Sequence, residues 1–191
     1  MNLLDKDGEA FFFENVFSKE ESDQYLMKLQ NEIAWRQEPI KIFGKSVMQP
    51  RLTAWYGDAD KTYRYSGLLM TPQAWSPSLL EIKKRVEALA AVEFTSVLLN
   101  FYRNERDSMG WHRDNEKELG QNPVIGSVSF GATRRFDFRH YFEKSLKSSV
   151  DLTHGSFLLM KGATQQNWEH SIQKSSRPIG PRINLTFRVL I

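Results

Sequence analysis

The sequence contains no cysteine among its 191 residues. Without a thiol, the chain can form no disulfide, no thiolate nucleophile and no cysteine-ligated zinc or iron–sulfur centre. It also has no apolar run near the roughly 20 residues that a membrane-spanning helix needs. Its first residues, Met1–Glu9, are too acidic and too short in apolar run for a signal peptide. We therefore expect no membrane partner and a chain compatible with the cytosol.

The sequence has little excess of either charge. Lys and Arg number 26 against 23 Asp and Glu, for a formal net charge of +3. This balance favours polyanionic partners only weakly. Hydrophobic residues make up 40% of the chain, which is ordinary for a globular protein of one domain with a sizeable core. No internal repeat, low-complexity tract or linker divides residues 1–191, so we expect a single domain.

Two helices and a hairpin are expected in the first half. Ser18–Glu21 reads as a capping box, and apolar residues recur at helical spacing after it. Ser76 and Pro77 open the second helix, because proline fits a first helical turn. Between the two helices, residues 40–47 predict a hairpin that turns near Phe43.

Short alternating strands are expected after about residue 94. They are Ser96–Tyr102, Val124–Phe130, Arg135–Tyr141, Ser156–Met160 and Ile183–Leu190. Strands at this spacing favour a sandwich or barrel, here braced by the two helices. The fold class expected is therefore mixed and mainly β.

The most informative of these strands is the one near the C-terminus. Alternate side chains of a strand share a face, so Arg182, Asn184, Thr186 and Arg188 point one way and the apolar residues between them point toward a core. Arginine offers a planar fork that binds carboxylates through two hydrogen bonds. The strand thus predicts a small acid as ligand, and a dicarboxylate would use both arginines. The alternative is an edge strand whose arginines are solvated.

A metal site is expected beside this strand. His112 and Asp114 are two residues apart, so an extended segment puts both on one face with Cα atoms about 6–7 Å apart. His170 is chosen as the third ligand because it precedes the loop that leads into the arginine strand. Two histidines and one carboxylate form the facial triad of non-haem Fe(II) oxygenases. His140 and His154 are rival ligands, although a structural or phosphate-facing role fits each of them better.

These residues resemble the AlkB family of Fe(II)- and 2-oxoglutarate-dependent dioxygenases, whose fold is a double-stranded β-helix, or jelly roll. The resemblance runs from about residue 40 to the end and is greatest to the animal nuclear member that repairs duplex DNA. It implies a nucleotide-recognition lid over about residues 40–70 and a catalytic jelly-roll core over about residues 95–191. The stretches that carry it are Asn100-Phe101-Tyr102, His112-Arg113-Asp114, Pro123–Gly131, His170-Ser171 and Pro181–Arg188.

The resemblance implies a role for each residue of the catalytic site. His112, Asp114 and His170 would hold Fe(II), with 2-oxoglutarate and O2 as cosubstrates. Arg182 would bind the distal carboxylate of 2-oxoglutarate, helped by the Tyr102 hydroxyl. The other cofactor-binding residues would hold the opposite end of this molecule or line the same pocket. They are Asn100, Asn184, Thr186 and Arg188.

The resemblance also implies residues that bind the damaged base. Tyr65 and the His112 ring would sandwich the base once it has left the stack. Tyr63 and Glu116 would contact its polar edge. The alternatives are a tyrosine that packs within the lid and a Glu116 that is a solvated charge at a helix start.

Further residues are expected to contact the nucleic acid around that base. Phe43, at the tip of the predicted hairpin, would insert as an apolar wedge into the gap left by the base. Alternatively it folds back as packing onto Val47 or Trp35. Basic residues would line a phosphate path or form a solvated face. They are Arg51, Arg134, Arg135, Arg139, Lys144, Lys147, Lys174 and Arg177.

The function expected is oxidative demethylation of N-alkylated bases in DNA, of the 1-methyladenine and 3-methylcytosine type. It would act by direct reversal and release formaldehyde, succinate and CO2. An RNA demethylase of the same chemistry and a non-catalytic nucleic-acid-binding jelly roll are the alternatives. The expected partner is alkylated DNA, single- or double-stranded, bound by a monomer in the bacterial cytoplasm or the eukaryotic nucleus.

Overall fold

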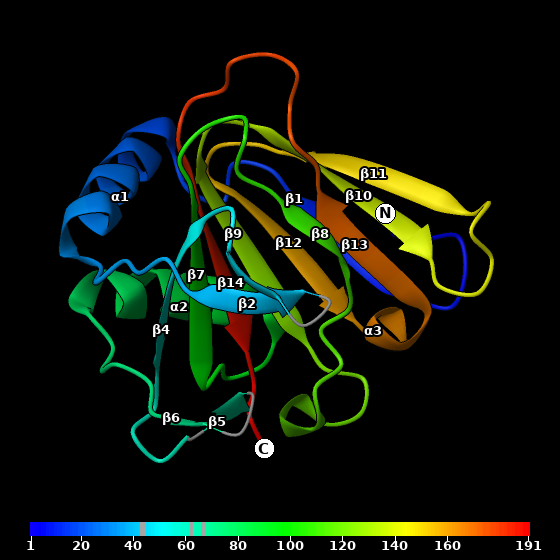
Figure 1. Ribbon diagram of the computed structural model, residues 1–191, viewed down its shortest axis with the longest axis horizontal. Helices are drawn as coiled ribbons and strands as arrows, with labels where there is room; N and C mark the ends of the chain where they lie inside the picture. Colours follow the sequence, from blue (N-terminus) through cyan, green and yellow to red (C-terminus); the bar gives the residue numbers. More distant parts are fainter. Residues whose placement is uncertain (43–44, 62, 66–67) are drawn as a thin grey trace.

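The protein has a helical layer and two β-sheets stacked on one another (Figure 1). The computed structural model describes residues 1–42, 45–61, 63–65 and 68–191, and the side chains of residues 1–40, 46–61 and 71–191. No helix in this described part is long and apolar enough to cross a membrane.

Both predicted helices are confirmed. In α1 (Lys19–Glu32) the Ser18 hydroxyl accepts the Glu21 N–H, and the Glu21 carboxylate accepts the Ser18 N–H, which completes the capping box. In α2 (Pro77–Ala90) Ser76 is the cap and Pro77 lies in the first turn. A short α3 (Thr164–Asn167) and a 3-10 turn (Lys117–Leu119) were not predicted.

The larger sheet has six strands, all paired antiparallel, in the order β1-β12-β9-β14-β7-β4. The strands are β1 (Glu9–Phe13), β12 (Ser156–Lys161), β9 (Ile125–Gly131), β14 (Arg182–Arg188), β7 (Ser96–Tyr102) and β4 (Leu52–Gly57). The arginine strand, β14, therefore has a neighbour on both sides. This arrangement excludes the alternative that it is a solvated edge.

The smaller sheet has four strands in the order β11-β10-β13-β8, also antiparallel. They are β11 (Lys147–Leu152), β10 (Arg134–His140), β13 (Trp168–Ile172) and β8 (Met109–His112). Two separate hairpins are β2 (Pro39–Ile42) with β3 (Lys45–Met48) and β5 (Tyr63–Tyr65) with β6 (Leu68–Met70). The paired antiparallel sheets form the predicted jelly roll.

The larger sheet is apolar on both faces, and each face belongs to a different core. Toward the helices, Leu185 and Phe187 of β14 pack with Leu79 and Ile82 of α2, all fully buried. Toward the smaller sheet, Ile125 and its neighbours pack with aromatic residues of β10 and β13. The pocket described below lies between the two sheets, where polar side chains replace part of this apolar packing.

The structure corrects two expectations about the chain. The predicted lid over about residues 40–70 includes β4, which is a strand of the larger sheet. Likewise β1 and β4 join the larger sheet from outside the range of about 95–191 that was expected to form the jelly-roll core. Among the described residues of the lid range, the hairpins β2–β3 and β5–β6 stand apart from the two main sheets.

Candidate metal and cofactor site

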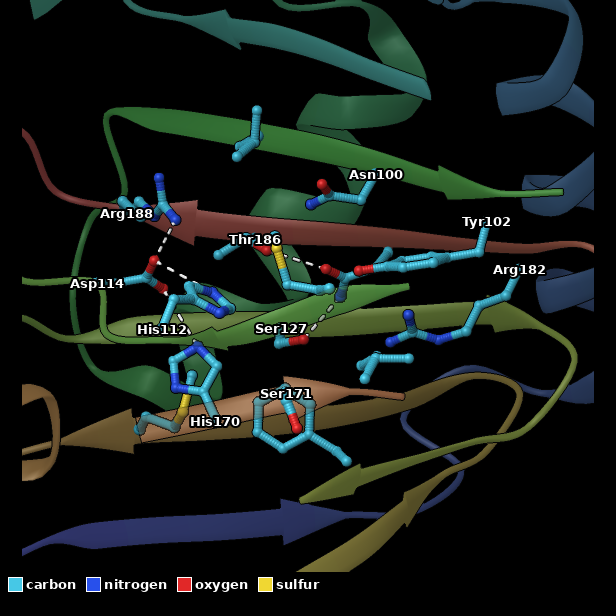
Figure 2. A pocket seen from close by; sticks show the side chains of 16 residues that line it. Asn100, Tyr102, His112, Asp114, Ser127, His170, Ser171, Arg182, Thr186 and Arg188 are labelled. Atoms are coloured by element: carbon cyan, nitrogen blue, oxygen red, sulfur yellow. Dashed lines mark hydrogen bonds and ion pairs between the residues drawn. The ribbon is translucent and has the colours of Figure 1, made fainter. Parts of the chain in front are cut away.

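The polar face of β14 forms one wall of a pocket between the two sheets. Arg182 lies opposite Tyr102 of β7, and Asn184 lies opposite Asn100. The predicted alternation is confirmed, because Ile183, Leu185 and Phe187 face the helices. The pocket is lined by Leu98, Asn100, Tyr102, Met109, His112, Asp114, Ser127, Phe136, Met160, His170, Ser171, Ile172, Arg182, Asn184, Thr186 and Arg188 (Figure 2).

His112, Asp114 and His170 meet at one end of this pocket. Their ligand atoms lie within 4.8 Å of one another, and no other such group of His, Cys, Asp and Glu occurs in the described part of the chain. The two histidines meet because they are register partners across β8 and β13. The Nε2 atoms of both histidines lie 3.9 Å from carboxylate oxygens of Asp114. Figure 2 shows the three side chains turned toward one another.

The protonation states of His170 and Asp114 suit metal binding. Burial, with a further contribution from His112, lowers the pKa of His170 to about 3, so its ring is neutral near pH 7. Burial alone would raise the pKa of Asp114, but Arg188 and the two histidines outweigh it and hold this pKa below its ordinary value. A neutral imidazole and an ionised carboxylate are the forms that bind a metal ion.

The donor atoms present therefore fit Fe(II). The Nδ1 atom of His112 is 2.9 Å from the Gly110 carbonyl oxygen, and a hydrogen bond there leaves Nε2 as the ligand atom. Two imidazoles and one carboxylate are the donor set of non-haem Fe(II) sites. The three residues predicted as ligands are thus brought together.

The rival histidines have structural surroundings. The Nδ1 atom of His140 accepts the Glu143 N–H, and its Nε2 lies 3.5 Å from Asp7. The Nδ1 atom of His154 accepts the Gly131 N–H, and its Nε2 lies 3.1 Å from Asp23. Each ring therefore links separate segments of the fold, as the structural alternative predicts.

Arg182 lies at the other end of the pocket with its charge unmatched. Its side chain is fully buried, and Nη2 donates to the Ser129 hydroxyl at 2.8 Å. Its Nε and Nη1 atoms are buried without a hydrogen-bond partner among the described residues. Burial lowers the pKa of Arg182 to about 10, which leaves the guanidinium charged near pH 7. A buried cation with two unused donors fits a carboxylate ligand such as the distal end of 2-oxoglutarate.

The other predicted cofactor-binding residues line the pocket, but most of their polar atoms already have partners. Arg188 Nη2 donates to Asp114 Oδ1 at 2.7 Å, so its charge is matched by a predicted metal ligand. Asn184 donates to the Ser127 hydroxyl at 2.7 Å, and Thr186 donates to Asn184 Oδ1 at 3.0 Å. Arg188 Nε, however, is buried without a hydrogen-bond partner among the described residues, so the expectation that one dicarboxylate uses both arginines stays a prediction.

The predicted base-binding residues are only partly described. Phe43 lies outside the described residues, and so do the side chains of Tyr63 and Tyr65, whose backbone forms β5. Glu116 caps the 3-10 turn without a side-chain hydrogen bond to it, and its Oε2 is buried with no partner among the described residues. Arg51 is nearly buried, and its Nε donates to Asn100 Oδ1 at 2.8 Å, so it supports the pocket wall.

The predicted phosphate path is corrected at Arg134. This residue is 3% exposed, and its guanidinium donates to the carbonyl oxygens of Asp107 at 3.0 Å and Gln173 at 2.7 Å. It therefore ties two loops together inside the protein. Arg135 pairs with Asp137, while Arg139 and Lys144 share Glu169 on the outer face of the smaller sheet. Lys147, Lys174 and Arg177 are exposed and form no ion pair within the described part of the chain.

Two residues that hold the pocket were missed in the sequence. Ser127 and Ser129 of β9 bind Asn184 and Arg182 through their hydroxyls. Their spacing of two residues between buried apolar neighbours placed both on one face of a strand. That signal was present in the sequence, but serine is too common on strands to single out without a partner.

The sequence is similar to known proteins along nearly all of its length. Residues 9–188 match the 2OG-Fe(II) oxygenase superfamily. The chain is 41% identical over 182 residues to the alpha-ketoglutarate-dependent dioxygenase alkB homolog 3 of Homo sapiens, in an alignment that covers 89% of this chain and 62% of that protein. It is 38% identical over 186 residues to the DNA oxidative demethylase ALKBH2 of Homo sapiens, covering 92% of this chain and 71% of that protein.

The chain thus spans less than two thirds of the length of the alkB homolog 3 proteins of Homo sapiens and Bos taurus, 62% in each case. The structure is similar to that of OsALKBH1, with a TM-score of 0.66 over 94% of this chain and 97% of the other. At 17% sequence identity, this second likeness shows a shared fold.

Proposed function

The chain belongs to the 2OG-Fe(II) oxygenase superfamily and, within it, to the AlkB family, and from this we propose that it demethylates N-alkylated bases in DNA. The proposed reaction is oxidative and depends on Fe(II), 2-oxoglutarate and O2. Its proposed substrates are bases of the 1-methyladenine and 3-methylcytosine type.

One observation carries this proposal. A cluster of two histidines and a carboxylate shares a pocket with a fully buried guanidinium that has two unused donors. A site that binds only a metal ion does not require a buried guanidinium, and a site that binds only an acid does not require the cluster of two histidines and a carboxylate. An enzyme that uses iron together with a 2-oxo dicarboxylate requires both.

The bound iron and 2-oxoglutarate would supply the oxidising chemistry, in which succinate and CO2 form and the hydroxylated N-methyl group leaves as formaldehyde. The protein supplies binding and orientation. His112, Asp114 and His170 would hold the iron, and Arg182 would fix the distal carboxylate of 2-oxoglutarate. Tyr102, whose ring centroid lies 5.2 Å from the Arg182 guanidinium carbon, would help to bind that carboxylate through its hydroxyl.

Similarity to relatives that act on DNA supports DNA as the substrate. ALKBH2 is named a DNA oxidative demethylase, and the identities to ALKBH2 and to alkB homolog 3 are close, 38% and 41%. Glu116 lies two residues beyond Asp114 with a buried, unpaired carboxylate oxygen, and it would accept a hydrogen bond from the polar edge of a base. Tyr63 and Tyr65 would stack on that base or pack within the lid. We propose a monomer as the active form.

The test is incubation with Fe(II), 2-oxoglutarate and a panel of methylated oligonucleotides, read by mass spectrometry. The panel contains DNA and RNA of the same sequence, each single- and double-stranded, with 1-methyladenine, 3-methylcytosine or no lesion. We expect repaired DNA and an equal amount of succinate, and neither with Asp114→Ala. Repair of RNA alone would favour the RNA demethylase. Binding of DNA without repair or succinate formation would favour the non-catalytic alternative.

The strand preference is tested at Phe43. Extruding a base costs a few kcal/mol in a duplex and little in a single strand. A wedge at residue 43 therefore predicts that Phe43→Ala slows repair of double-stranded lesions strongly and single-stranded lesions slightly. An equal loss on both substrates would refute the wedge.

A further inference from the structure

The short helix α3 lies directly behind the segment that carries two of the three metal ligands. The main-chain N–H of Asp114 donates to Gln165 Oε1 at 2.9 Å. The Arg113 side chain donates from Nη1 to the Gln166 carbonyl oxygen at 2.8 Å. Two adjacent residues of the metal-binding segment are thus hydrogen-bonded to two adjacent residues of α3.

Asp114 needs this support because the strand before it has already ended. β8 stops at His112, the last residue paired with β13. The N–H of Asp114 therefore has no strand partner, although the residue is 3% exposed. A buried N–H without an acceptor is costly. The Gln165 side chain supplies the acceptor that a neighbouring strand would otherwise provide.

Gln165 is itself held in place. Its side chain is 1% exposed, and its Nε2 lies 3.6 Å from the sulfur of Met160, which lines the pocket. The preceding residue, Thr164, is fully buried and donates to the Lys161 carbonyl oxygen at 2.6 Å. It also accepts the Glu9 N–H at 2.8 Å. The acceptor for Asp114 is therefore anchored on β1 and β12 of the larger sheet.

We propose that Gln165 is a positioning residue for the metal, which acts by fixing the backbone of Asp114. Arg188 holds the carboxylate of Asp114 and Gln165 holds its main chain, so the ligand is restrained at both ends. Partners of this kind keep a metal ligand in its binding orientation. The inference rests on the metal site of the proposed function, but not on the nucleic-acid substrate.

The experiment measures metal binding in the absence of 2-oxoglutarate and DNA. Mn(II) is titrated into metal-free protein, and free Mn(II) is read by electron paramagnetic resonance. Gln165→Leu keeps the size of the side chain but removes the acceptor, and we expect about 10- to 100-fold weaker binding. Gln165→Glu keeps an acceptor oxygen at the same distance along the side chain and should bind as wild type does.

The matched control is Gln166→Leu, next to Gln165 on α3. The Gln166 side chain donates to Asn122 at an exposed position, and its carbonyl remains for Arg113 in the variant. We expect wild-type Mn(II) affinity for this control. If Gln165→Leu does not fold, Gln165→Asn takes its place, because its shorter amide cannot reach Asp114 and should also bind weakly.

The outcomes separate the two proposals. Wild-type affinity in Gln165→Leu or Gln165→Asn, or an equal loss in Gln165→Glu, would overturn the role of Gln165 and leave the proposed function intact. If the wild-type protein binds no Mn(II), the metal site of the proposed function fails, and the role of Gln165 fails with it.

Discussion

Arg182 and Arg188 lie six residues apart on the same face of β14, yet their surroundings differ. Arg188 is paired with Asp114 at 2.7 Å, so a carboxylate of the protein matches its charge. Arg182 is fully buried, donates to one serine hydroxyl and has no carboxylate partner among the described residues. One strand thus presents a matched cation at the metal end and an unmatched cation at the opposite end.

From this difference we expect the two ends of the pocket to bind different ligands. A buried cation that lacks a partner costs free energy in the empty protein and recovers it when an anion binds. A cation that already has a partner instead fixes that partner in place. Arg182 is therefore expected to govern the affinity for 2-oxoglutarate, and Arg188 the geometry of the metal ligands.

Removal of a metal ligand should have the largest effect. His112→Ala, Asp114→Ala and His170→Ala are each expected to abolish turnover while the protein stays folded, since no spare donor lies within reach of the cluster in the described part of the chain. Demethylation is measured by mass spectrometry, and folding by circular dichroism. His154→Gln is the control and should retain activity. Near-normal activity in His170→Ala, with His140 or His154 then essential, would contradict the assignment.

The next largest effect is expected at Arg182, the arginine without a carboxylate partner among the described residues. Arg182→Lys keeps a charge but loses the planar fork, so the 2-oxoglutarate requirement should rise about 10- to 100-fold, which corresponds to roughly 1.5–3 kcal/mol for a charge-assisted hydrogen bond. The measurement is the dependence of succinate formation on 2-oxoglutarate concentration. Mn(II) affinity should stay unchanged. An unchanged 2-oxoglutarate requirement would make this end of the strand structural.

Arg188→Gln should act at the metal end of the pocket, where Arg188 is paired with Asp114. Loss of the partner of Asp114 is expected to weaken Mn(II) binding by about tenfold. At saturating metal, the 2-oxoglutarate requirement should change much less than in Arg182→Lys. If both arginine variants raise that requirement equally, the two ends of the pocket are not divided as proposed, and a shared ligand would fit better.

The last expected effect is a pH dependence of the stability of the metal-free protein. The pKa of His170 is about 3 in the fold, mainly because of burial, against 6.5 for an ordinary histidine. Between these values the unfolded chain binds the extra proton and the folded chain does not, so the free energy of unfolding should fall as the pH drops below 6.5. Arg182, with a pKa of about 10, does not titrate in this window.

The variant that tests this dependence is His170→Phe, whose ring would lie among Phe136 and Phe138. Between pH 6.5 and the pH at which Asp114 takes up a proton, the melting temperature of this variant should change less with pH than that of the wild type. The melting temperatures of the two metal-free proteins are measured by calorimetry across this pH range. An equal slope in both would assign the acid sensitivity to other groups.

The sequence predicted those parts of the fold that repeat with a regular period. The alternation of Arg182 to Arg188 placed the polar face of β14, and the spacing of His112 and Asp114 placed both on one segment. β13 could not be found in this way, because its sequence places three polar residues in a row between Trp168 and Ile172 and shows no alternation, although all five residues are buried. β11 was missed because its outward residues and its serines lack an apolar pattern.

Pairings between distant residues were also beyond the sequence. Arg188 and Asp114 are 74 residues apart, and Arg51 and Asn100 are 49 apart. Nothing local distinguishes these arginines from solvated ones. Arg134 is the clearest example. It was expected on the surface, but its guanidinium donates hydrogen bonds to three loop carbonyl oxygens inside the protein.

The place of β14 also sets the order in which a growing chain can acquire its structure. β14 is the last strand of the larger sheet to be synthesised, yet it lies between β9 and β7. Until it emerges from the ribosome, β9 and β7 cannot be joined, and each presents an open edge to other chains. The same seven residues bring Arg182 and Arg188. Closure of the sheet and completion of the pocket are therefore one late event, because the pocket lacks the guanidinium of Arg182 until β14 is in place.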